Sequence, residues 1–176
     1  MPVKRSFAFI FFVALAVSFT DFHLVQAQQE QSKQDQTAQD AAASFAAGVA
    51  AYHAEDYQKA YEAWMPLAED GDNAAQYNVG ILYQYGLGTT QNVSEAVKWY
   101  MKSAEAGFPD ASMHLGDLYA SGFFGEPDDA SAIVWYEKAQ AQGAAGAETK
   151  LAAARARMIP AIPPGSQGSV QGTNTE

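Results

Sequence analysis

The sequence predicts an all-α fold, an α/α superhelical solenoid of about three helix pairs plus a C-terminal capping helix. Its main evidence is a pattern that occurs twice, 36 residues apart, and combines Gly-x-x-Tyr with Trp-Tyr-x-Lys. The two copies begin at Gly80 and Gly116 and reach Lys102 and Lys138. Apolar residues inside both copies recur at helical spacing. A repeat of this length is typical of solenoids, in which neighbouring units bury each other's apolar faces.

The predicted repeat domain spans residues 41–158. It divides into three helix pairs and a cap, at about residues 41–71, 72–107, 108–143 and 144–158. Helix-terminal residues support these boundaries. Gly86 suits a helix end with positive φ, Asn92 is a favourable N-cap, and Pro109 is favourable in a first helical turn.

Two glycines of the repeated pattern, Gly80 and Gly116, fall in the middle of predicted helices. Glycine costs about 1 kcal/mol relative to alanine in a helix interior. We therefore expect the paired helix to approach closely at each glycine, with Trp99 and Trp135 buried in the space behind.

The first 27 residues have the features of a signal peptide. Lys4 and Arg5 precede a mainly apolar run over residues 7–19, and Val25-Gln26-Ala27 offers small residues for cleavage after Ala27. The run is shorter than the roughly 20 residues that cross a bilayer. We expect a periplasmic or secreted protein without stable membrane insertion after cleavage. A retained amino-terminal anchor that extends through Val25 is the alternative.

The segments that flank the repeat domain contain little to bury. Residues 28–40 are rich in glutamine and predict a flexible leader. Residues 159–176 form a segment rich in Pro, Gly and Ser, which predicts a disordered tail.

Charge and cysteine content exclude several classes of function. Loss of Lys4, Arg5 and Asp21 with the signal peptide leaves 8 basic and 19 acidic residues, a net charge of −11. Such a chain repels phosphate backbones and anionic headgroups, which argues against nucleic-acid and membrane-surface partners. The absence of cysteine excludes disulfides, thiolate metal sites and a cysteine-linked lipid anchor.

These residues resemble the Sel1-like repeat family, which is related to the tetratricopeptide repeat but has longer turns. The resemblance is strong over residues 73–143. It is weaker over residues 46–71, where the glycine-containing insertion is missing. The resemblance implies an α/α superhelix that binds proteins or peptides, typically as an adaptor or regulator, and exported bacterial members are common.

In related repeats the first helix of each pair lines the concave face. Carried over to this chain, this arrangement gives ten candidate partner-binding residues: Phe45, Val49, Tyr52, Tyr77, Asn78, Ile81, Gln84, Met113, His114 and Asp117. The three first helices contain no lysine or arginine, so a clamp for a terminal carboxylate is not expected. The remaining aromatic and aliphatic trough with acidic points suits a neutral or basic segment of another protein, with apolar anchors.

Alternative interpretations of this surface stay open. Tyr77, Ile81 and Met113 can instead pack between repeats. Phe123 and Phe124 form a second candidate apolar patch, or lie under the last helix. Recognition of cell-wall glycan or peptide, or a structural role there, is the competing function.

No catalytic, cofactor or metal site is expected. His114 and Asp117 lie three residues apart and could share a helix face, but no nucleophile, phosphate loop or His-Glu-x-x-His motif accompanies them. His114 occupies the position that Asn78 holds one repeat earlier. This equivalence favours an interhelical hydrogen bond over catalysis or metal binding.

Overall fold

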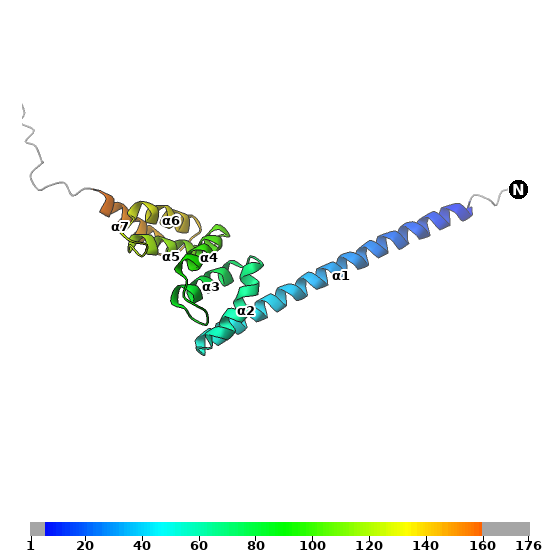
Figure 1. The fold of residues 1–176 in the computed structure, drawn as a ribbon. Helices are drawn as coiled ribbons and strands as arrows, with labels where there is room; N and C mark the ends of the chain where they lie inside the picture. The colour runs from blue at the N-terminus through cyan, green and yellow to red at the C-terminus, as the bar shows by residue number, and fades with distance from the viewer. Residues whose placement is uncertain (1–5, 160–176) are drawn as a thin grey trace, which may run out of the picture.

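The computed structural model describes residues 6–159, with side chains from residue 21 onward. Within this range the chain is helical, without β-strands, and consecutive helices pack against each other. The helices are α1 (Ser6–His53), α2 (Tyr57–Glu69), α3 (Asn73–Tyr85), α4 (Val93–Glu105), α5 (Pro109–Ala120), α6 (Asp129–Ala141) and α7 (Ala147–Met158). Figure 1 shows α2–α7 stacked in one array, from which α1 projects. The predicted all-α solenoid is therefore confirmed. The predicted tail, apart from Ile159, lies outside the described residues.

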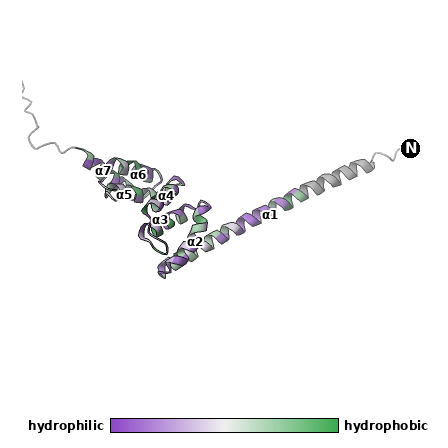
Figure 2. Ribbon diagram, viewed as in Figure 1, coloured by the Kyte–Doolittle hydropathy of each residue, from purple (hydrophilic) through white to green (hydrophobic). Residues whose placement is uncertain are grey.

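Helix α1 is much longer than the sequence suggests. The flexible leader predicted over residues 28–40 is helical in the structure, although its side chains are exposed. This segment contains no glycine or proline and is rich in glutamine, so it retains helix propensity without burial. Figure 2 shows mainly polar colouring along this part of α1. Among the described residues, no helix combines the length and the hydropathy needed to cross a membrane.

The predicted helix-terminal residues take their expected roles. The Asn92 side chain accepts a hydrogen bond from the Glu95 amide at 3.1 Å and caps α4, and Pro109 begins α5. Gly86 ends α3 with a φ of 66°, in the left-handed region that glycine adopts without strain. These local signals fix where each helix begins and ends.

In each helix pair, a glycine in the middle of the first helix lies directly against an aromatic ring of the second helix. An added Cβ at Gly80 would lie 2.5 Å from Tyr100 Cε1, and one at Gly116 would overlap the Tyr136 ring. In the first pair, Gly48 faces Trp64 in the same way. The expectation of close approach is thus met, but the second aromatic residue of each Trp-Tyr pair makes the contact.

The two tryptophans of the repeated pattern differ in burial. Trp99 is 7% exposed and belongs to the apolar cluster formed by α2 and α3, whereas Trp135 is only half-buried. The prediction that Trp135 is buried is therefore wrong. Trp135 packs against the next cluster, which has Val97 at the position where the first cluster has the larger Tyr61. The smaller Val97 side chain therefore shields the Trp135 ring from solvent less than a tyrosine would.

Candidate peptide-binding surface

The structure gathers four of the ten predicted residues around one pocket between α1 and α3. Val49 and Tyr52 come from α1, and Asn78 and Ile81 come from α3. The pocket has a volume of about 190 Å³ and is completed by His53 and Trp64. We call it the concave pocket. Its mainly apolar lining and its size suit a single bulky side chain of a partner.

Packing fixes the shape of the concave pocket. Trp64 is 3% exposed, and its Nε1 donates a hydrogen bond to the Phe45 carbonyl at 3.2 Å. The Tyr52 ring lies 5.8 Å from the Trp64 ring and 5.4 Å from Tyr57. Phe45 also packs on Trp64 and does not line the pocket. These contacts hold the aromatic wall in one arrangement, which lowers the entropy cost of binding.

Asn78 adds a polar group to the wall of the concave pocket. Its side chain is half-buried and makes no hydrogen bond to any residue that the structure describes. A side-chain amide has two donors and an acceptor. Asn78 can therefore pair with the backbone of a bound segment whose side chain enters the pocket.

A second group of predicted residues, Tyr77, Gln84 and His114, is committed to contacts between repeats. The buried Gln84 Oε1 accepts a hydrogen bond from the Tyr100 hydroxyl at 2.6 Å and lies 2.9 Å from His114 Nε2. Because an amide oxygen only accepts, His114 Nε2 carries the proton and donates it. The interhelical hydrogen bond predicted for His114 is thus present.

Burial shifts the pKa values of His114 and Tyr77. Desolvation lowers the pKa of His114, an effect to which Lys150 adds and which Asp117 opposes. Burial also raises the pKa of Tyr77, whose ring lies 5.6 Å from Tyr100 and 5.4 Å from Phe108. A neutral imidazole engaged with Gln84 stabilises packing between repeats. The packing alternative therefore describes the geometry of Tyr77, and Gln84 and His114 are likewise engaged in contacts between helices.

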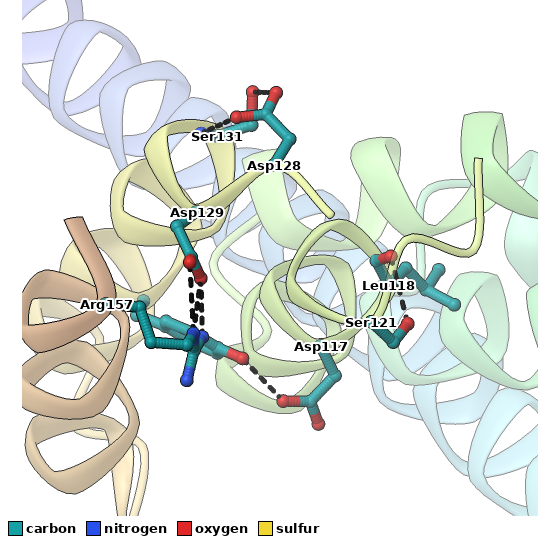
Figure 3. Close-up of polar contacts among 8 residues, drawn as sticks. Asp117, Leu118, Ser121, Asp128, Asp129, Ser131 and Arg157 are labelled. Atoms are coloured by element: carbon teal, nitrogen blue, oxygen red, sulfur yellow. Dashed lines mark hydrogen bonds and ion pairs between the residues drawn. The ribbon is translucent and has the colours of Figure 1, made fainter. Parts of the chain in front are cut away.

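The last two predicted residues, Met113 and Asp117, lie toward the C-terminal end of the array. Met113 packs against the cluster shared by α6 and α7. Asp117 accepts hydrogen bonds from Lys150 Nζ at 2.5 and 2.6 Å and from the Tyr136 hydroxyl at 2.8 Å. Figure 3 shows Asp117 directed toward this hydroxyl, and Arg157 bound to Asp129. Asp117, one of the acidic points expected in the trough, is therefore paired with Lys150 and Tyr136.

Helix α7 brings basic side chains to this end of the concave surface. Lys150 and Arg157 line a groove of about 510 Å³ with Asp117, Ser121 and Tyr136. Residues 41–53 of α1, together with α3 and α5, contain no lysine or arginine, as expected, but α7 supplies both. Each cation is bound to an aspartate, at 2.5 Å for Lys150–Asp117 and 2.5 Å for Arg157–Asp129. The groove therefore has no unpaired cation to clamp a carboxylate.

Sequence reasoning missed Trp64, His53 and Lys150 as part of this surface. The 36-residue repeat would have identified Lys150, since it follows Asn78 and His114 at intervals of 36 residues. Trp64 occupies the register of Tyr100 and Tyr136, and only the packing reveals that its ring also borders the pocket. Among the described residues, no cluster of three or more His, Asp or Glu side chains could hold a metal ion.

Comparisons with known proteins agree with this architecture. Residues 73–108 and 109–143 match the Sel1 repeat, which confirms the resemblance where the sequence pattern is strongest. A Sel1 repeat protein from Oxalobacter formigenes is 34% identical with a TM-score of 0.50, and the match covers 53% of this chain and 38% of that chain. A protective antigen of uropathogenic Escherichia coli strains, which displays an SLR fold, is 26% identical with a TM-score of 0.62.

The match to the E. coli antigen covers 68% of this chain and 27% of that chain. This chain thus spans less than half the length of either structural relative. No protein with a curated function matches it.

Proposed function

Because residues 73–143 consist of two Sel1 repeats, we propose that this chain is a non-enzymatic adaptor or regulator that binds another protein in the bacterial cell envelope. Sel1 repeats generally form scaffolds for protein–protein interaction, and the family is typically non-catalytic. The partner inserts an apolar side chain into the concave pocket. The concave pocket is the observation that carries this proposal.

The chemistry of the pocket defines the partner segment. Val49, Ile81 and the Trp64 ring favour an aliphatic or aromatic anchor, and Asn78 favours an accessible backbone beside it. The strongly negative chain favours neutral or basic flanking residues. Cell-wall glycan binding has less support, because Trp64 and Trp99 are only 3% and 7% exposed and Lys138 lies over the ring of the half-exposed Trp135.

Site-specific photocrosslinking tests the proposed function. A photoreactive phenylalanine at Ile81 should capture a discrete partner in envelope extract, whereas the same probe at the exposed Val134 on α6 should not. Filling the pocket with Val49→Phe should remove the crosslink at Ile81 while the helical spectrum is unchanged. Sedimentation of the chain with purified cell wall, without any protein crosslink, would support the glycan alternative instead.

A further inference from the structure

Two equivalent loops lie along one edge of the array, residues 86–92 between α3 and α4 and residues 122–128 between α5 and α6. Their ends are held in the same way. Asn92 N donates to the Tyr83 carbonyl at 2.9 Å, and Asp128 N donates to the Tyr119 carbonyl at 2.9 Å. Any difference in how the two loops pack must therefore arise from the residues between these anchored ends.

The first loop lies directly on the neighbouring helix. Gly88 lies against the Tyr57 backbone so closely that an added Cβ would overlap the Tyr57 carbonyl oxygen. Beside it, the Tyr61 and Tyr83 hydroxyls are 2.9 Å apart and their rings are 5.8 Å apart. The space between this loop and α2 is therefore filled by the chain itself.

The second loop leaves the corresponding space open. At the period of 36 residues, Val97 replaces Tyr61, and Phe124 replaces Gly88. Phe124 packs on Tyr119 at 5.1 Å, whereas an added Cβ at Gly125 would meet no atom within 4 Å. The result is a groove of about 360 Å³, here called the loop-side groove, which is lined by Val93, Ser94, Val97, Tyr119 and Phe124.

The loop-side groove has exposed apolar edges and an unpaired negative charge. Phe123 and Phe124 are 44% and 46% exposed, so neither is hidden under the last helix. Glu126 lies two residues after Phe124 in the same loop and has no partner among the described residues. Glu95 is paired with Lys98, Asp128 caps α6 and binds Ser131, and Asp129 is bound to Arg157. Lys98, which follows the lining residue Val97 in α4, is 2.6 Å from Glu95 and so is already paired with an acidic side chain.

We propose that the loop-side groove is a second docking site, for a partner segment in which a bulky apolar side chain is flanked by lysine or arginine. The apolar side chain lies between Val97 and Phe124, and the basic residue faces Glu126. A strongly anionic chain selects a cationic segment over an acidic one of the same shape. The groove shares no lining residue with the concave pocket, so this inference does not depend on the proposed function.

Methyl NMR of the purified chain, as its cells process it, tests the proposal. The probes are two synthetic peptides, acetyl-Lys-Leu-Lys-amide and acetyl-Glu-Leu-Glu-amide. The basic peptide should shift the Val93 and Val97 methyl signals in a saturable manner, and the acidic peptide should bind at least ten-fold more weakly. The Val49 methyl signals report the concave pocket in the same spectra. Shifts at Val49 without shifts at Val93 and Val97 would overturn the proposal, as would equal binding of the two peptides.

Variants copied from the closed loop provide the matched controls. Val97→Tyr restores the residue that fills this space one repeat earlier, and Phe124→Gly restores the glycine of the first loop. Each should weaken the basic peptide at least ten-fold. Val134→Tyr makes the same change at an exposed site on α6 and should leave binding unchanged. Undiminished binding by either groove variant with a native-like spectrum would overturn the proposal, so the test survives if one variant fails to fold.

Discussion

At the scale of single residues, the repeat depends on a glycine that has no room for a side chain. Tyr100 is fully buried and cannot move away from Gly80. In α7 the equivalent position holds Ala152, which is exposed because no described helix packs on it. Glycine therefore appears where a ring from the paired helix occupies the position of the Cβ.

Gly80→Ala should destabilise the chain even though alanine favours helix. Overlap with the Tyr100 ring costs about 3 kcal/mol, and the gain in helix propensity is about 1 kcal/mol. We expect a net loss of about 2 kcal/mol in the free energy of unfolding, measured by urea denaturation. The opposite change at the exposed counterpart, Ala152→Gly, should cost only about 1 kcal/mol. A stabilised Gly80→Ala variant would contradict the close packing of α3 on α4.

His114 should make stability depend on pH in the mildly acidic range. Desolvation lowers its folded pKa, so the unfolded chain binds a proton first as the pH falls. The contribution of neutral His114 is then largest above the unfolded pKa of about 6.5 and is lost as the pH falls from there through the folded pKa. The charged groups that act on His114 are Asp117 and Lys150, which bind each other.

His114→Asn, which copies Asn78, removes this titration. The stability of the original chain relative to this variant should fall as the pH is lowered from about 7 through about 6.5, as measured by denaturation at several pH values. Parallel pH profiles of the two proteins would show that His114 does not titrate differently on folding.

At the scale of helices and loops, the two repeats share a sequence pattern but differ in packing. Tyr61 and Leu87 pack against the cluster that contains Trp99, whereas the cluster next to Trp135 has the smaller Val97 at the position of Tyr61. A sequence period predicts the same environment for both tryptophans. The structure shows that the environment depends on residues in the preceding helix.

Alanine substitution should separate the two tryptophans. Trp99→Ala should cost about 3–5 kcal/mol, the usual range for truncation of a buried ring. Trp135→Ala should cost clearly less, because this ring is already half-exposed. Urea denaturation measures both losses, and tryptophan fluorescence should be more red-shifted in Trp99→Ala, which retains Trp135. Equal losses for the two variants would mean that Trp135 is as well covered as Trp99.

At the scale of the whole molecule, the sequence predicts an all-α solenoid of paired helices and most helix ends, because periodicity and capping are local signals. The sequence also identifies the first helices of the pairs as the surface that contains the concave pocket. It does not show that Gln84 and His114 bind each other, since that contact depends on how α3 and α5 stack. Nor does the sequence show whether Trp99 or Tyr100 faces Gly80, because both residues recur at the same interval of 36 residues.

The amino-terminal helix raises the last question at this scale, namely where the mature chain begins. The repeat array uses only the end of α1 near α2, and the side chains of residues 21–40 are exposed. Removal of residues 21–27 would therefore take away no buried side chain. N-terminal sequencing of the protein from the envelope fraction should begin at Gln28, and melting temperatures with and without residues 1–27 should agree. Recovery of the chain in membranes with Met1 intact would instead support the retained anchor.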